Sequence, residues 1–287
     1  MKKYLLVIDQ GTTSSRIVLY DKKFQIFDIA QKEFRQFFPK EGWVEHDANE
    51  IWNDVKNLIK KILAKNKLQS KNIISIGITN QRETTVLWNK KTGKPIYRAI
   101  VWQDRRTSLY CANLKKKGLH KKIQKITGLQ LDPYFSATKI KWILDNVTKA
   151  KKNLYNNNLL FGTIDTWLLW KLTEGKSHLT DITNASRTMI FDPKKEEWSK
   201  SILDIFGISK KILPEVKENV FKFGSTKLFG EPIVIGGMAG DQQSATIGQA
   251  CFNIGQSKST YGTGCFLLMN IGSKFKISRN RLLSTVA

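Results

Sequence analysis

Residues 4–20, YLLVIDQGTTSSRIVLY, carry the clearest structural pattern in the sequence. An apolar run ends in Asp9, and Arg16 opens a second apolar run that ends at Tyr20. Both runs are rich in β-branched and aromatic residues, which predicts two buried strands. Gly11 and four consecutive hydroxyl residues lie between them. A glycine lets the chain turn tightly and expose its backbone N–H groups. The segment therefore predicts a hairpin whose turn can hold a phosphate beside an acidic residue.

Strand and helix signals alternate through the rest of the chain. Further strands are predicted at 24–34, 73–79, 84–88, 233–237, 257–261 and 266–269, and helices at 140–147, 167–172 and 242–250. Residues 47–50, DANE, resemble a capping box, and apolar residues at helical spacing follow as far as Leu63. The polar stretch 149–158 is interpreted as a solvated loop or helix end. The first three strands predict an antiparallel meander, and the whole pattern predicts a mixed α/β sheet flanked by helices.

The composition is that of an ordinary globular protein. The 287 residues are 41% hydrophobic and 25% charged, and no apolar stretch approaches the ~20 residues of a membrane span. The apolar start ends too early for a signal peptide, which predicts a cytoplasmic protein without membrane insertion. The three cysteines lack CxxC spacing, so neither a disulfide framework nor a zinc site is expected. The net charge of +24 comes mostly from lysines spread along the chain, so no nucleic-acid partner is expected.

Two further glycine-rich segments resemble binding turns. In residues 236–243, GGMAGDQQ, Asp241 stands at a predicted helix start, as a plain N-cap or as a general base beside a substrate. Residues 260–264, TYGTG, suit either a phosphate-contacting turn or a plain hairpin. The GKS at 175–177 is not a Walker A loop, because Trp170 occupies the position of its first glycine. Without a GxGxxG fingerprint, a Rossmann dehydrogenase is excluded as well.

Taken in order, the three turns resemble those of the actin-like and hexokinase-like ATPase fold, which has a ribonuclease H-like motif. Residues 134–142, YFSATKIKW, with Asp145 and Asn146, are similar to a signature of the FGGY carbohydrate kinases. Longer runs are similar to the members of that family that phosphorylate glycerol, and the resemblance covers the whole chain. These runs are 9–16, 42–47, 77–85, 100–103, 161–167, 181–189, 239–243 and 261–266.

The resemblance implies transfer of the γ-phosphate of ATP to glycerol, with Mg²⁺, to give sn-glycerol 3-phosphate and ADP. The implied glycerol-binding residues are Arg82, Glu83, Trp102, Tyr134, Asp241 and Gln242. The implied phosphate-binding residues are Thr12, Thr13, Ser14, Arg16 and Thr263. The implied catalytic residues are Asp241, as the base, and Asp9, which positions Mg²⁺; both are also the implied metal ligands. The resemblance allows a homo-oligomer.

The resemblance also predicts the domain organisation. Residues 1–249 correspond to the N-terminal, glycerol-binding domain, and residues 250–287 to a truncated start of the nucleotide-binding domain. Two alternatives remain open: a non-catalytic remnant or glycerol-binding domain, and a kinase for another sugar. The loop 223–232 corresponds to one that binds fructose 1,6-bisphosphate in feedback-regulated relatives. It has no arginine here, so weak or absent inhibition is expected.

Overall fold

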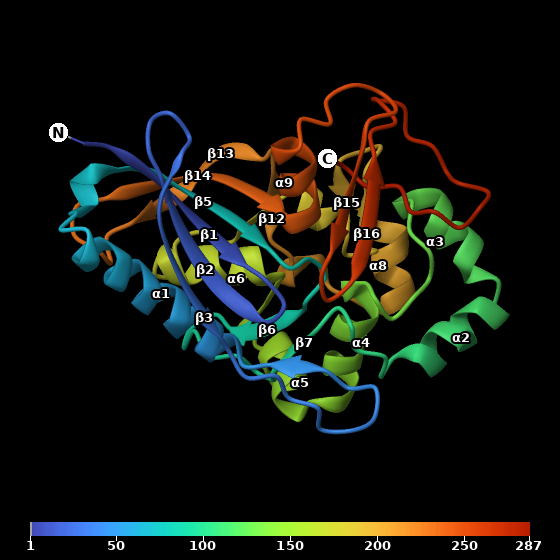
Figure 1. The fold of residues 1–287 in the computed structure, drawn as a ribbon. Coiled ribbons are helices and arrows are strands. Elements are labelled where there is room, and N and C mark those ends of the chain that lie inside the picture. The colour runs from blue at the N-terminus through green and yellow to red at the C-terminus, as the bar shows by residue number, and fades with distance from the viewer. Residues whose placement is uncertain (1) are drawn as a thin grey trace.

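The computed structural model describes residues 2–287 and is built around a six-stranded mixed sheet (Figure 1). The strand order is β13-β14-β5-β1-β2-β3. The strands are β1 (Tyr4–Gln10), β2 (Ser14–Tyr20), β3 (Ile26–Glu33), β5 (Ile73–Asn80), β13 (Val220–Thr226) and β14 (Ile233–Gly240). β1, β2 and β3 form the predicted antiparallel meander, and β5 runs parallel to both β1 and β14. The predicted mixed α/β sheet is confirmed.

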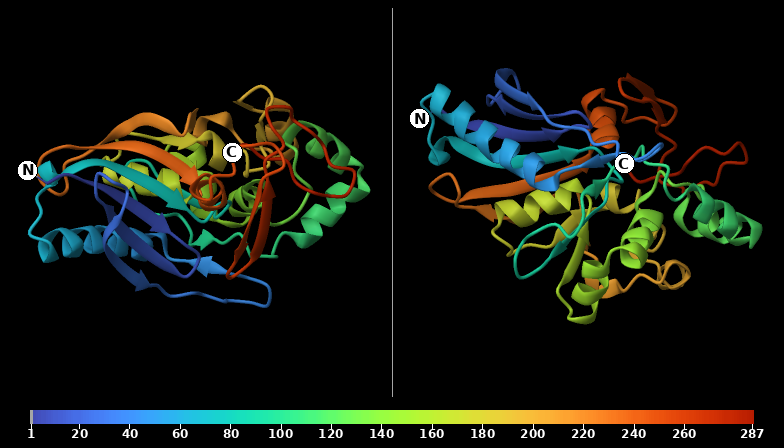
Figure 2. Two further views of the ribbon diagram at one scale, coloured as in Figure 1. Left: turned by 45° about the horizontal axis from the view of Figure 1, so that its top comes forward. Right: turned by 90° about the horizontal axis from the view of Figure 1, so that it is seen from below.

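The sheet buries one face beneath helices. In β1 the alternate residues Leu6 and Ile8 are fully buried, because successive side chains of a strand point to opposite faces. Helices α1 (Ala48–Lys65) and α6 (Ile164–Leu172) pack on that face and share one apolar core with it (Figure 2). The buried Trp167 of α6 anchors this layer by donating an indole hydrogen bond to the Ala48 carbonyl of α1.

Two local expectations need correction. The Asp47 side chain caps α1 by accepting a hydrogen bond from Asn49 N at 2.8 Å. Glu50, however, does not complete a capping box, because its carboxylate pairs with Arg35 Nε at 3.0 Å. The stretch 149–158 was predicted as a solvated loop or helix end, but most of it forms helix α5 (Thr148–Tyr155), which ends within the stretch. The buried Ala150 of α5 is the apolar contact that offsets the polar composition.

A second apolar core lies beside the sheet, among helices. Helices α2 (Ser108–Lys116), α3 (Leu119–Thr127), α4 (Ser136–Asn146) and α8 (Lys200–Phe206) enclose Phe135, Ile140 and Phe206. The remaining elements are short: η1 (Ser70–Asn72), β4 (Glu45–His46), β6 (Val86–Asn89), β7 (Ala99–Ile100), β8 (Leu159–Gly162), β9 (Leu179–Asp181), α7 (Ile182–Ala185), β10 (Phe191–Asp192), β11 (Glu197–Trp198), η2 (Lys210–Ile212) and β12 (Glu215–Lys217).

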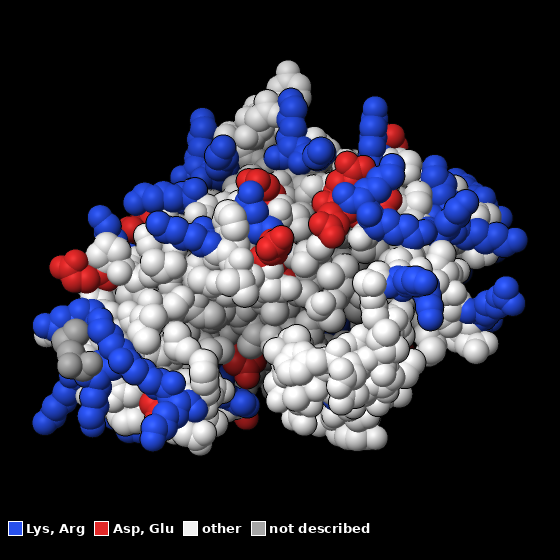
Figure 3. All heavy atoms as spheres, turned by 90° about the horizontal axis from the view of Figure 1, so that it is seen from above, with Lys and Arg blue, Asp and Glu red and all other residues white. Residues whose placement is uncertain are grey.

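After helix α9 (Asp241–Gly248) the chain forms a hairpin, β15 (Ser257–Tyr261) and β16 (Cys265–Met269). In the described part of the chain, these two strands pair only with each other. Within residues 2–287, no helix combines the length and apolarity that a membrane crossing requires. On the face shown in Figure 3, Lys and Arg side chains lie in separate groups rather than in one continuous stripe.

Candidate active site

The candidate site forms where three parallel strands end. In the sheet register Asp9 of β1 lies beside Thr79 of β5, and Thr79 lies beside Ala239 of β14. Parallel strands bring their carboxyl ends to one edge, which is where α/β sheets bind ligands. Asp9, the segment 80–83 and Asp241 therefore meet, although they are far apart in the sequence.

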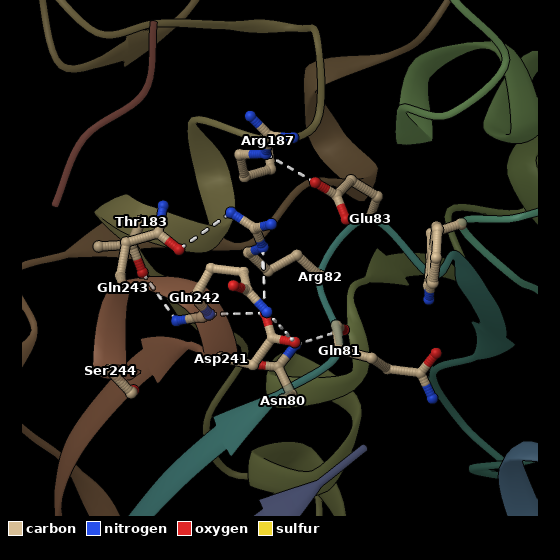
Figure 4. A network of polar contacts seen from close by, with 12 residues as sticks. Asn80, Gln81, Arg82, Glu83, Thr183, Arg187, Asp241, Gln242, Gln243 and Ser244 are labelled. Atoms are coloured by element: carbon tan, nitrogen blue, oxygen red, sulfur yellow. Dashed lines mark hydrogen bonds and ion pairs between the residues drawn. The ribbon is translucent and has the colours of Figure 1, made fainter. Parts of the chain in front are cut away.

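Arg82 and Asp241 face each other at this edge (Figure 4). Arg82 Nε lies 3.1 Å from Asp241 Oδ1, and the Arg82 side chain is only 4% exposed. The Nε group is nevertheless misaligned for a hydrogen bond and has no partner for one among the described residues. Gly240 permits this approach, because a Cβ there would lie 2.6 Å from Arg82 Cδ. The Asp241 carboxylate is 35% exposed, so it is the member of this pair that a polar ligand can reach.

Glu83 is held by contacts from distant segments. Its backbone has a φ of 60°, in the left-handed region that non-glycine residues rarely adopt. Its carbonyl accepts a hydrogen bond from Ser136 Oγ at 2.9 Å. Its carboxylate pairs with Arg187 Nε at 2.6 Å, and both side chains are buried (Figure 4). Backbone strain of this kind, at a residue with positive φ, is often found at functional sites.

Tyr134 stands over the same ion pair. Burial first, and the negative charge of Glu83 second, raise the pKa of Tyr134 to about 12, so its hydroxyl stays neutral and can donate. The guanidinium of Arg187 lies 5.5 Å from the Tyr134 ring centre. The fully buried Lys139 secures the backbone here, because its ammonium group donates to the carbonyls of Pro133, Tyr134 and Phe135.

Trp102 forms an apolar wall next to these polar groups. Its ring meets Tyr134 edge to face at 5.6 Å and Phe266 of β16 at 5.8 Å. Its indole Nε1 donates to Thr12 Oγ1 at 2.9 Å, which links the wall to the hydroxyl-rich turn. A few converging polar groups against an aromatic wall are the usual makeup of a small-molecule site.

Two carboxylates at the strand ends fit a divalent cation. Burial raises the pKa of Asp9, the positive charge of Arg16 opposes this, and the negative charge of Asp241 adds to it. Asp9 Oδ2 lies 3.6 Å from Arg16 Nη1. Among the described residues, no group of three or more Asp, Glu, His or Cys side chains is arranged to hold a metal ion by itself. Mg²⁺ commonly binds through one or two carboxylates, waters and substrate phosphates, so Asp9 and Asp241 suit it.

The β1–β2 turn and the β15–β16 turn differ in which hydroxyl side chains remain available to a ligand. In the first turn Gly11 N donates to Ser14 O at 2.9 Å, which closes the hairpin and leaves Thr13 exposed. Ser14 Oγ already accepts a hydrogen bond from Gln31. Thr263 is exposed at the turn between β15 and β16, where its side chain makes no hydrogen bond within residues 2–287. Its turn is nonetheless close to the site, because Gly264 lies beside Trp102.

A buried polar network supports the strand ends. Asn80 and Asn184 exchange side-chain hydrogen bonds of 3.0 and 3.1 Å. Asn184 also donates to Asp181 Oδ1 at 2.6 Å. Thr183 Oγ1 contacts Asp181 and accepts from Gly240 N at 2.9 Å, directly before Asp241. The network thus joins the backbone before Arg82 to the backbone before Asp241.

Three side chains that contact or support the candidate site were missed from the sequence: Arg187, Lys139 and Lys258. Arg187 and Lys139 lie inside runs that resemble kinases, which was the only available signal for them. The partner of Arg187 is more than a hundred positions away in the sequence, so spacing could not reveal it. Lys258 lies on β15, two residues before Thr260, among many other lysines.

Comparisons with known proteins agree with this architecture. The profile of the FGGY family of carbohydrate kinases, N-terminal domain, matches residues 4–248. A glycerol kinase of Clostridium botulinum (strain Langeland) is 55% identical over the whole chain, which covers 58% of that relative. A glycerol kinase of Bacillus licheniformis is 53% identical with the same coverage. The chain therefore spans little more than half the length of these relatives.

Solved structures show the same fold. Plasmodium falciparum glycerol kinase with ADP superposes with a TM-score of 0.93 at 40% identity, over 99% of this chain and 57% of that one. Gluconate kinase from Lactobacillus acidophilus gives a TM-score of 0.82 at 23% identity, over 93% of this chain and 54% of that one. The second likeness concerns the fold alone.

Proposed function

The chain belongs to the FGGY family of carbohydrate kinases, and we propose that it binds glycerol as part of an ATP-dependent glycerol kinase. The observation that supports this most directly is the ion pair between buried Arg82 and the part-exposed Asp241, with Glu83, Tyr134 and Trp102 around it. An uncharged triol needs several converging hydrogen-bonding groups and an apolar wall. The high identity to glycerol kinases favours glycerol over another sugar.

In the proposed reaction Asp241 accepts the proton of a terminal glycerol hydroxyl. The hydroxyl oxygen forms a bond to the γ-phosphorus of ATP, and the bond from that phosphorus to the bridging oxygen breaks to release ADP. Arg82, Glu83 and Tyr134 hold the other hydroxyls, Gln242 stays next to Asp241, and Trp102 packs against the carbon chain. Such transfer depends mainly on positioning and charge neutralisation.

The phosphate and metal roles follow the same proposal. Thr12, Thr13, Ser14 and Arg16 hold phosphate oxygens from the β1–β2 turn, and Thr263 holds them from the β15–β16 turn. Asp9 and Asp241 would hold Mg²⁺, which would neutralise phosphate charge. We propose residues 1–249 as the glycerol-binding domain and residues 250–287 as the beginning of the nucleotide-binding domain.

The test is ATP-dependent formation of glycerol 3-phosphate by the purified chain, with glycerol binding measured by calorimetry. Turnover that falls at least ~100-fold in Asp241→Asn supports the complete proposal, since general bases contribute about that much. Glycerol binding without turnover supports a non-catalytic glycerol-binding domain, a candidate because the chain spans 58% of its relatives. If folded chain binds xylulose or gluconate but not glycerol, the substrate assignment is wrong.

A further inference from the structure

Lys258 brings a further cationic group to the candidate site. It projects inward from β15, is only 6% exposed, and donates from Nζ to Gln242 Oε1 and to Thr260 Oγ1, the latter at 2.7 Å. Burial lowers the pKa of Lys258, and the negative charge of Asp241 opposes that change. The ammonium group is thus close enough to Asp241 for the two charges to interact.

The contact with Lys258 determines which way the Gln242 amide faces. An ammonium group has three donors and no acceptor, so the amide must present its oxygen to Nζ. Its nitrogen then lies on the other side, where Nε2 donates to Asp241 Oδ2 at 3.3 Å (Figure 4). The flipped amide would place its NH₂ group against an ammonium and its oxygen against a carboxylate. Both of those contacts are repulsive, so one orientation is selected.

We propose that Lys258 is a positioning residue that orients the Asp241 carboxylate through the side-chain amide of Gln242. Gln242 N donates to Asp241 Oδ1 at 2.7 Å, so a fixed Gln242 holds both carboxylate oxygens at once. Arg82 approaches the same Oδ1 from the end of the neighbouring strand β5. The carboxylate rotation is then set before a substrate binds, which is the preorganisation that proton transfer requires.

This inference rests on the proposed function only where glycerol is the probe. The first experiment titrates glycerol into the 287-residue chain by calorimetry, using Lys258→Met, Lys258→Arg, Gln242→Met and the double variant Lys258→Met/Gln242→Met. We expect Lys258→Met to weaken glycerol binding roughly tenfold, because a charge-assisted hydrogen bond is lost. Lys258→Arg should keep most of the native affinity, since the arginine side chain also has hydrogen-bond donors and no acceptor.

The double variant tests the route through Gln242. If Lys258 acts through the amide, the double variant binds glycerol no more weakly than Gln242→Met. Additive losses would overturn the relay, as would full affinity in Lys258→Met. Lys274→Met is the matched control, because it removes an exposed lysine from the segment after β16 and should change nothing. If Lys258→Met does not fold, unchanged glycerol affinity in Gln242→Met still overturns the proposal.

A second readout does not depend on glycerol. In a chain with ¹⁵N-labelled glutamine, the Gln242 side-chain resonances are assigned by their disappearance in Gln242→Met. We expect them to be distinct from free amides in the native chain and in Lys258→Arg, and to move toward the free position in Lys258→Met. An unchanged signal in Lys258→Met would refute the relay. Failure of the native chain to bind glycerol would count against the proposed function alone.

Discussion

At the scale of single residues, the buried ion pair of Glu83 and Arg187 should contribute both to the stability of the fold and to glycerol binding. Replacing Arg187 with methionine would leave the Glu83 carboxylate buried without its counter-charge, which costs about 3 kcal/mol of unfolding free energy or more. We expect Arg187→Met to lower the unfolding free energy by that amount, measured by urea denaturation, and to weaken glycerol binding. The double variant Glu83→Gln/Arg187→Met should regain part of the stability but none of the affinity.

The matched control for that experiment is Arg35→Met. Arg35 pairs with Glu50 at 3.0 Å, but its side chain is mostly exposed, so its loss should cost less than ~1 kcal/mol. Equal destabilisation by both substitutions would show that the buried Glu83–Arg187 pair contributes no more to stability than an exposed ion pair does.

Residues inside compact motifs were predictable from the sequence, and residues that act across the fold were not. Asp9 and the turn after it stand together in the sequence, where an acidic strand end and a glycine predict a binding turn. Lys258 acts only because β15 brings its ammonium group to Gln242, sixteen positions earlier. The left-handed backbone of Glu83 also has no sequence signal, since tertiary contacts hold a residue type that does not favour it.

At the scale of elements, the buried polar network beside the ends of β5 and β14 should make the free energy of unfolding depend on pH. Burial, and then the charge of Asp165, raise the pKa of Asp181 from 3.8 to about 7. The folded chain therefore holds a proton that the unfolded chain loses, and this group's contribution falls as pH rises from about 4 to about 7. Burial lowers the pKa values of His46 and His178. Their contribution to stability therefore changes in the opposite sense and falls as pH drops below about 6.5.

A comparison with Asp181→Asn isolates the carboxyl contribution. We expect its unfolding free energy to decline less than that of the native chain between pH 5 and pH 7, in urea denaturation at each pH. Asp145→Asn, which changes a half-exposed carboxylate, should follow the native slope. Parallel pH profiles for Asp181→Asn and the native chain would contradict the assignment.

The long elements were predicted better than the short ones. Strand β1 and helix α1 show clear period-2 and helical spacing, because each buries one regular face. Strand β13 has only two buried residues and was not predicted from the sequence. β4, β7, β10 and β11 have two residues each, too few for any period to appear. The parallel pairing of β1, β5 and β14, which creates the site, depends on crossovers that no local pattern specifies.

At the scale of the whole molecule, the hairpin of β15 and β16 leaves apolar surface in solvent. Its inward side chains reach Trp102 and Gln242, while the outward Tyr261, Leu267 and Met269 are 82%, 71% and 57% exposed. The strands have no partner beyond each other among the described residues, so their outer edges also present unpaired backbone groups. Neighbouring apolar side chains at an open strand edge favour association between chains.

We therefore expect the 287-residue chain to self-associate as its concentration rises. The double variant Leu267→Lys/Met269→Lys should reduce this association severalfold, because lysines at a strand edge oppose pairing, and should leave the unfolding midpoint nearly unchanged. Sedimentation velocity over a concentration series measures the association. Leu109→Lys, which alters an exposed leucine on α2, is the control and should behave as the native chain does. If the hairpin variant associates as strongly as that control, the contact lies on another surface.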